Sequence, residues 1–205
     1  MYLLILAGGA GTRLWPISRQ NNPKQISELF STETMIERTW KRLRRRYPAR
    51  QIFICTSGES AKFIRKVLPD LSSANLLVEP RACGTAAAIG YGAARILAKH
   101  GNVPLFVVSS DHHIQNEKEY FKVLHQVAQT LKKHPAKTVL VGVKPVYAET
   151  GYGYIKFRKT RNLKFPIYEA ERFIEKPSLE RAREFFGSGN YYGMPECLVG
   201  IRKRY

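Results

Sequence analysis

The residues best suited to chemistry lie near the start of the chain, where a short apolar run leads into a glycine-rich loop. The end of the run and the loop supply these candidates: Leu6, Ala7, Gly8, Gly9, Gly11, Thr12 and Arg13. Glycines let the backbone turn sharply and approach a ligand, and the amide N–H groups of such a loop can point at an anion. Arg13 adds a rigid fork of donors that fits a phosphate. The pattern predicts a phosphate-binding loop after a first strand, and the alternative is a tight turn with an incidental arginine.

The loop matches neither of two familiar nucleotide-binding motifs. Leu14 stands where the third glycine of a dinucleotide fingerprint would lie, and no Gly-Lys-Ser/Thr follows, as a Walker A loop requires. The loop alone is therefore a weak signal, and its interpretation depends on the rest of the chain.

Acidic positions further along the chain are suited to the same chemistry. Asp111 follows an apolar run, and a lone carboxylate there can hold Mg²⁺ together with substrate phosphates. The alternative is a cap for the next helix. His112 and His113 are interpreted as neighbours rather than ligands, because Mg²⁺ prefers oxygen. Glu175 and Lys176 could grip a sugar hydroxyl and a phosphate, and their alternative is a surface ion pair in a turn.

Alternating strand and helix patterns must position these residues. Strand patterns cover 2–6, 51–56, 76–80, 105–109 and 138–143, and helix patterns cover 31 or 32 to about 47, 59–68, 85–100 and 118–133. The alternation predicts an α/β fold with a mostly parallel sheet and helices on both faces. Beyond residue 145, strands are expected at 151–155 and 170–174, with a helix over 178–187. Ligands of such sheets bind at the carboxyl ends of the strands, where the candidate residues lie.

The length and composition predict one globular domain with a real core, because 44% of the 205 residues are hydrophobic. No apolar run is long enough to span a bilayer, and the first residues lack the features of a signal peptide. Cys55, Cys83 and Cys197 are too few and too widely spaced for a disulfide framework or a zinc site. We therefore expect a cytoplasmic protein without a membrane partner.

The formal net charge of +18 favours a partner that carries phosphate. Nucleic acid is one such partner, and a polyphosphate substrate is another. The densest basic cluster, residues 41–46, is predicted to be the solvated end of a helix. No RNP motif or zinc finger accompanies it, so nucleic acid is the less favoured partner.

Several segments together resemble the sugar-phosphate nucleotidyltransferases, and within them the bacterial mannose-1-phosphate guanylyltransferases. The segments are 6–16, 23–25, Asp111, 149–155 and 173–177, in the family's order and spacing. Trp15 and the run Glu-Thr-Gly-Tyr-Gly-Tyr-Ile at 149–155 point to that branch. The resemblance covers residues 1 to about 192. It implies a Rossmann-like nucleotide-diphospho-sugar transferase fold, with a mostly parallel mixed sheet flanked by helices.

The resemblance implies that GTP and mannose 1-phosphate give GDP-mannose and pyrophosphate, with Mg²⁺ as cofactor. By resemblance, Arg13, Lys24 and Asp111 are catalytic, and Asp111 holds the metal ion. The residues implied to bind the nucleotide are Leu6, Ala7, Gly8, Gly9, Gly11, Thr12, Glu79, Pro80 and Thr85. Those implied to bind the sugar phosphate are Gly151, Tyr152, Gly153, Glu175 and Lys176. The sequence leaves open whether the protein forms a homo-oligomer.

The chain departs from the family pattern in two places. Gly84 stands where the family has an asparagine, so a side chain that could contact the base is missing. After Tyr192 the family continues Trp-Asn-Ser/Ala-Gly-Met-Phe, whereas this chain reads Gly-Met-Pro-Glu-Cys-Leu. Deleting one nucleotide from suitable codons for the family sequence gives Gly-Met-Pro-Glu-Cys, so we interpret residues 193–205 as a frameshifted tail.

This interpretation leaves a partial nucleotidyltransferase domain at 1–192, a sheet that is incomplete at its C-terminal side, and weak or absent catalysis. One alternative is a nucleotidyltransferase for another sugar phosphate or base. Another is a nucleotide-binding remnant without catalytic activity.

Overall fold

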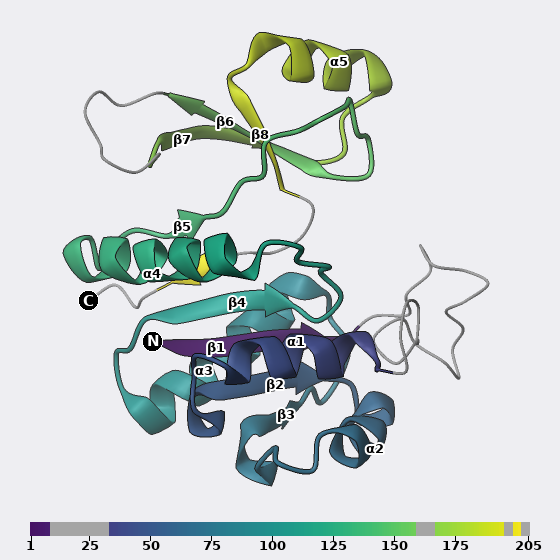
Figure 1. The fold of residues 1–205 in the computed structure, drawn as a ribbon, viewed down its shortest axis with the longest axis vertical. Helices are drawn as coiled ribbons and strands as arrows, with labels where there is room; N and C mark the ends of the chain where they lie inside the picture. The colour runs from purple at the N-terminus through teal and green to yellow at the C-terminus, as the bar shows by residue number, and fades with distance from the viewer. Residues whose placement is uncertain (9–32, 159–166, 195–198, 202–205) are drawn as a thin grey trace. The chain divides into compact units, whose positions relative to one another are not determined.

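The computed structural model describes residues 1–8, 33–158, 167–194 and 199–201. The chain divides into two compact units (Figure 1). Unit 1 comprises Met1–Val139 and Val199–Tyr205, and unit 2 comprises Leu140–Leu198. Among the described residues, no helix has the length and apolar character needed to cross a bilayer.

Unit 1 is built on a six-stranded sheet with the order β3-β2-β1-β4-β9-β5. The strands are β1 (Tyr2–Ala7), β2 (Ile52–Thr56), β3 (Leu76–Val78), β4 (Leu105–Ser109), β5 (Val139–Leu140) and β9 (Val199–Ile201). The pairs β1–β2, β1–β4 and β2–β3 are parallel, and β9 runs antiparallel to β4. In the register of the sheet, Leu4 lies opposite Phe53 on one side and Val107 on the other. The predicted parallel core of the sheet is therefore confirmed.

Helices cover both faces of this sheet, as the alternating pattern predicts. The helices of unit 1 are α1 (Met35–Arg44), α2 (Gly58–Val67), α3 (Thr85–His100) and α4 (Glu117–Lys133), with short 3-10 turns η2 (Ala49–Gln51) and η3 (Ser73–Asn75). Figure 1 shows α1 in front of the strands and α3 behind them. The core of unit 1 lies between these layers, because β2 and β4 are buried along their whole length.

A capping sequence defines the N-terminus of α1. Thr34 caps the helix, and its hydroxyl accepts a hydrogen bond from the Glu37 amide while the Glu37 carboxylate accepts one from the Thr34 amide. This capping box satisfies two backbone donors that the first turn leaves without helical partners. The helix pattern predicted from residue 31 or 32 to about 47 is thus shorter in the structure, which gives Met35–Arg44.

Unit 2 contains a small antiparallel sheet, β7-β6-β8, and one helix. Its elements are β6 (Gly153–Arg158), β7 (Glu169–Ile174), α5 (Leu179–Ser188) and β8 (Tyr191–Met194). Tyr154 and Phe185 pack in its core with a centroid distance of 5.4 Å, beside the buried Ala182. Antiparallel strands can leave one face in water, and β7 is almost entirely exposed.

Several predicted strands have different bounds in the structure. The strand predicted over 76–80 ends at Val78. The run 138–143 contributes only Val139 and Leu140 to β5, and Val143 instead forms an isolated antiparallel bridge to Gly193. The strand predicted from Gly151 begins at Gly153. Within the segment interpreted as a frameshifted tail, Val199–Ile201 forms β9.

Candidate active site

The carboxyl ends of three neighbouring strands are tied together in unit 1. The hydroxyl of Thr56, at the end of β2, donates to the carbonyl of Ala7 at 2.7 Å. The carbonyl of Thr56 accepts a hydrogen bond from the amide of Glu79 at 2.9 Å. A Cβ atom at Gly8 would lie only 3.6 Å from Oε2 of Glu79. The ends of β1, β2 and β3 therefore bring three predicted nucleotide-binding residues, Ala7, Gly8 and Glu79, into one place.

Glu79 is a partly buried carboxylate at this edge of the sheet. Its burial raises the pKa of the carboxyl above its ordinary value of 4.5. Sequence reasoning found Glu79 but did not assign a site role to Thr56, which links it to Ala7. The sequence signal for Thr56 was its hydroxyl at the last position of a buried strand, where a polar side chain can contact neighbouring strand ends.

The neighbouring predicted residues Pro80 and Thr85 are both exposed. Thr85 begins α3, and Gly84 precedes it as N-cap with φ 85° and ψ 173°. Residues with a side chain rarely adopt this backbone conformation. Gly84 therefore lacks the asparagine side chain of the family pattern and adopts a backbone conformation that suits glycine.

Asp111 lies in the loop between β4 and α4. The hydroxyl of Ser109 donates a hydrogen bond to Oδ1 of Asp111, and the amide of Ser110 donates to the carbonyl of Leu6 at 3.1 Å. These contacts hold the loop beside the end of β1. The cap of α4 is Asn116, whose side chain accepts from the Glu119 amide at 3.0 Å. The alternative interpretation of Asp111 as a helix cap is therefore excluded.

The donor set at Asp111 fits a magnesium ion that also binds substrate. Among the described residues, no three His, Cys, Asp or Glu side chains lie together as a metal-binding group. Mg²⁺ commonly takes one or two carboxylates and completes its shell with water and substrate phosphates. Asp111 thus matches the protein's share of such a site.

The other residues predicted for phosphate binding, Gly9, Gly11, Thr12, Arg13 and Lys24, lie outside the described residues. Their roles stay predictions.

In unit 2, the structure brings the two predicted sugar-phosphate segments together. The amide of Lys176 donates to the carbonyl of Tyr152 at 3.2 Å. A Cβ atom at Gly153 would lie 2.3 Å from Cζ of Phe173 and 3.0 Å from Oε2 of Glu175. Glycine at this position therefore allows Phe173 and Glu175 to lie against β6. The side chains of Glu175 and Lys176 form an ion pair at 3.3 Å, and each is 58% exposed.

The loop before β6 is closed by Glu149 and Tyr154. Oε1 of Glu149 accepts a hydrogen bond from the Gly151 amide at 2.7 Å. That bond lowers the pKa of Glu149 below its ordinary value of 4.5. The buried hydroxyl of Tyr154 donates to the Glu149 carbonyl at 2.9 Å.

The backbone at Lys176, in the other predicted sugar-phosphate segment, is unusual. Lys176 has φ 40°, an uncommon conformation for a residue with a side chain.

The structure corrects one expectation about the basic cluster at 41–46. It was predicted to be a solvated helix end, but Arg42 is only 5% exposed and Leu43 is fully buried. Arg42 donates to the carbonyl of His112 at 3.3 Å and lies 3.7 Å from the carboxylate of Glu117. Arg44 and Arg45 are exposed as expected.

Comparisons with known proteins agree with this architecture. A family model described as Nucleotidyl transferase matches residues 2–204. The alginate biosynthesis protein AlgA of Pseudomonas aeruginosa is 32% identical over 208 residues, which cover all of this chain and 42% of that protein. A mannose-1-phosphate guanylyltransferase of Escherichia coli is 36% identical over 206 residues, which cover 98% of this chain and 43% of that protein.

Solved structures extend the agreement to three dimensions. A crystal structure of a mannose-1-phosphate geranyltransferase from Thermus thermophilus matches with a TM-score of 0.86 at 29% identity, covering 98% of this chain and 57% of that chain. A UDP-glucose pyrophosphorylase in complex with UDP-glucose, at 18% identity and a TM-score of 0.62, shares the fold. The chain spans less than half the length of the two curated relatives named above. The family match runs through the elements that carry the candidate site, and the chain belongs to the nucleotidyl transferase family.

Proposed function

We propose that this chain is the nucleotidyl-transfer part of a mannose-1-phosphate guanylyltransferase. A phosphate oxygen of mannose 1-phosphate attacks the α-phosphorus of GTP in line. A new P–O bond forms, the bond from the α-phosphorus to the bridging oxygen of the β-phosphate breaks, and pyrophosphate leaves. Such reactions depend on positioning and charge neutralisation rather than on covalent catalysis.

The observation that carries this proposal is the set of hydrogen bonds at the strand ends of unit 1. Leu6 accepts from Ser110, and Ala7 accepts from Thr56, which in turn binds Glu79. The glycine-rich loop therefore starts between a segment that carries one carboxylate, Asp111, and a segment that carries another, Glu79. We assign nucleotide binding to Leu6, Ala7, Gly8, Gly9, Gly11, Thr12, Glu79, Pro80 and Thr85.

Asp111 is the residue that would hold Mg²⁺ in this proposal, and Ser109 orients its carboxylate through Oδ1. When bound, the ion supplies charge neutralisation for the phosphates. Arg13 and Lys24 would stabilise the negative charge that moves toward the leaving pyrophosphate.

In unit 2, we assign the sugar phosphate to Gly151, Tyr152, Gly153, Glu175 and Lys176. The supporting observations are the bond between Lys176 and Tyr152 and the positive φ of Lys176. Residues with unusual backbone conformations are concentrated at ligand-binding sites. The exposed ammonium group of Lys176 would meet the phosphate, and the carboxylate of Glu175 would accept from sugar hydroxyls.

Ligand-dependent thermal stabilisation tests the proposal. The purified chain is heated with GTP, GDP-mannose, UTP or UDP-glucose, each with and without Mg²⁺, and GDP-mannose formation is measured in parallel. A ligand at 100 times its Kd stabilises the native state by about 2.7 kcal/mol. We expect stabilisation by GTP and GDP-mannose, and loss of the Mg²⁺-dependent part in Asp111→Asn. The matched control is Asp70→Asn, which changes an exposed aspartate that is not among the candidate site residues.

Each alternative predicts a different result. Stabilisation by another nucleotide sugar would favour a different substrate, and stabilisation without turnover would favour a nucleotide-binding remnant. Stabilisation only by oligonucleotides would contradict the proposal. The interpretation of residues 193–205 as a frameshifted tail stays a prediction, and resequencing of the gene tests it. It predicts that turnover by this 205-residue chain is weak or absent.

A further inference from the structure

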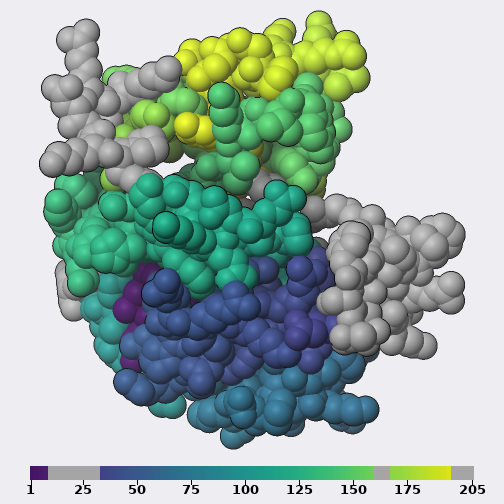
Figure 2. All heavy atoms as spheres, viewed as in Figure 1, coloured from purple at the N-terminus to yellow at the C-terminus, as the bar shows by residue number. Residues whose placement is uncertain are grey.

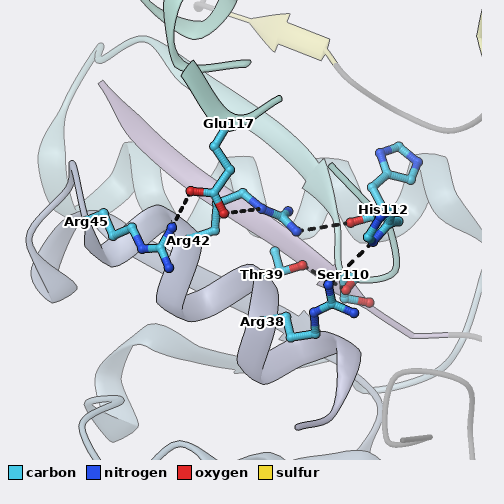
Figure 3. Close-up of polar contacts among 8 residues, drawn as sticks. Arg38, Thr39, Arg42, Arg45, Ser110, His112 and Glu117 are labelled. Atoms are coloured by element: carbon cyan, nitrogen blue, oxygen red, sulfur yellow. Dashed lines mark hydrogen bonds and ion pairs between the residues drawn. The ribbon is translucent and has the colours of Figure 1, made fainter. Parts of the chain in front are cut away.

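The loop that carries Asp111 is held from outside by one helix. The hydroxyl of Thr39 donates to the carbonyl of Ser110 at 3.0 Å. The guanidinium of Arg42 donates to the carbonyl of His112 at 3.3 Å. Figure 3 shows both side chains extending from α1 toward this loop. The carbonyls of the residues directly before and directly after Asp111 are therefore both bound by α1.

Thr39 and Arg42 can act together because they are three residues apart on α1, which places them on the same face of the helix. Their exposed fractions are 1% and 5%, and Ser110 is also 1% exposed. The hydrogen bond from Thr39 to Ser110 is therefore shielded from water, and the one from Arg42 to His112 is partly buried. A third residue of α1, Arg38, lies 3.4 Å from Nδ1 of His113, but this contact is exposed.

Arg42 is itself fixed by α4. Its Nε lies 3.7 Å from Oε1 of Glu117, and its guanidinium lies 6.0 Å from the centre of the Tyr120 ring. Arg45 pairs with the other oxygen of the same carboxylate. Figure 2 shows the side chains of α1 and α4 packed side by side on this face of unit 1. The arginine fork is therefore held in place before any ligand arrives.

Stability alone is a poor reason for this arrangement. Desolvating a charge costs several kcal/mol, and well-packed apolar residues often replace buried ion pairs without loss of stability. What the polar contacts add is a defined direction for two loop carbonyls, which an apolar contact would not give. Partners that orient a metal ligand influence metal affinity by about 10- to 100-fold.

We propose that Thr39 and Arg42 are positioning residues for Asp111, because they fix the backbone on both sides of its carboxylate. This inference rests on the proposed role of Asp111 as the Mg²⁺ ligand. In the chain, α1 lies between the glycine-rich loop and β2. The inference gives this helix a further function, which is to position the metal ligand.

Metal affinity tests the proposal directly. Mn²⁺ can replace Mg²⁺ at oxygen ligands, and electron paramagnetic resonance measures the free Mn²⁺ in the presence of GTP. We expect Thr39→Val, which keeps the shape of the side chain but removes the hydroxyl, to weaken Mn²⁺ binding by about 10-fold. Thr39→Ser restores the hydroxyl and is expected to bind within about twofold of the parent. Arg42→Lys, which loses the fork but keeps the charge, is expected to fall between them.

Arg44→Met is the matched control on the same helix. Arg44 is exposed and donates to the carbonyl of Tyr47, away from the loop. Its loss changes net charge without touching Ser110 or His112, so Mn²⁺ affinity should stay at the parent value. Thermal melts of every variant separate a loss of affinity from a loss of folded protein. If Thr39→Val does not fold, the comparison of Arg42→Lys with Arg44→Met carries the test.

The Asp111→Asn variant distinguishes two kinds of failure. If it loses Mn²⁺ binding while Thr39→Val and Arg42→Lys bind like the parent, the positioning role is wrong and the role of Asp111 stands. If Asp111→Asn also binds Mn²⁺ like the parent, or the parent binds none, the proposed metal site and the inference fail together.

Discussion

The two units hold their predicted site residues by different means. In unit 1, the loop of Asp111 is fixed by side chains that are almost completely buried, Thr39 and Arg42. In unit 2, Glu175 and Lys176 are largely exposed, and the loop is fixed by a main-chain bond from Lys176 to Tyr152. Buried side chains of α1 therefore help to position the segment around Asp111, whereas a main-chain hydrogen bond positions Lys176.

The comparison shows that burial decides how strongly the loss of one partner of an ion pair changes the free energy of unfolding. Arg42 and Lys176 are both basic residues with a glutamate partner. An exposed pair is screened by water and contributes about 0–1 kcal/mol. A buried guanidinium needs its partners, because an unpaired buried charge is strongly destabilising. Equivalent substitutions in the two regions should therefore have very different effects.

The largest effect is expected for Glu117→Gln in unit 1. The change leaves Arg42 with its contact to the His112 carbonyl but without a negative partner. A fully buried pair loses about 3–5 kcal/mol on removal of one partner, and since Glu117 is partly exposed we expect about 2 kcal/mol. Urea unfolding measures the change. The control is Glu119→Gln on the same helix, whose pair with Lys122 is exposed. Equal effects in the two variants would contradict the importance of burial.

Gly92→Ala is expected to have the next largest effect. A Cβ atom there would lie 2.5 Å from Cδ2 of Leu4, which is fully buried in β1 and has no room to move. Overpacking of this kind outweighs the better helix propensity of alanine, for a net loss of about 1 kcal/mol. The control is Gly90→Ala in the same helix, where a Cβ meets no atom within 4 Å. Its free energy of unfolding should rise instead, by about 0.5–1 kcal/mol.

Gly153→Ala makes the same substitution in unit 2. The approach to Cζ of Phe173 is even closer, at 2.3 Å. Phe173 is 46% exposed, however, so its ring can rotate into solvent. We expect a loss below about 1 kcal/mol, set by the altered rotamer. Hydrogen exchange of the β6 amides measures it. A larger loss than in Gly92→Ala would show that unit 2 is packed as rigidly as unit 1.

Much of the fold was predictable because its signals are local. The apolar runs, the Thr85–His100 helix and its closing Gly101 are recognisable from neighbouring residues alone, and the structure confirms them. The run 138–143 was not, because apolar character continues past Leu140 although the chain leaves the sheet there. Local hydropathy does not report which strand a segment will find as a partner.

The site was predictable only in part. Asp111 and Glu79 stand at strand ends, so the fold class itself places them. Thr39 and Arg42 were missed, because their partners are main-chain carbonyls about 70 residues away in sequence. Arginine at a helix end is normally solvated, and only the packing of α4 against α1 makes Arg42 an exception. The helical spacing of residues 39 and 42 beside the buried Ile36 and Leu43 was the available signal.

The hydrogen bond between Glu149 and the Gly151 amide can be tested by its dependence on pH. The hydrogen bond from Gly151 lowers its folded pKa below 4.5. Its stabilising contribution is therefore fully present above pH 4.5 and is lost as the pH falls through the lower folded value. NMR titration should show the Glu149 carboxyl and the Gly151 amide changing together, with a midpoint below 4.5. Glu149→Gln should remove that transition from the Gly151 amide, and an unchanged amide titration would contradict the assignment.

The smallest effect is expected for Glu175→Gln, the counterpart of Glu117→Gln. Both side chains of its ion pair are 58% exposed, so the free energy of unfolding should change by less than about 0.5 kcal/mol. The backbone bond between Lys176 and Tyr152 does not involve the substituted side chain and should persist. If Glu175 nevertheless binds sugar hydroxyls, as we propose, the loss will appear as weaker binding of GDP-mannose at unchanged stability. A variant that loses stability but keeps its affinity would reverse the comparison, because the exposed pair would then be structural.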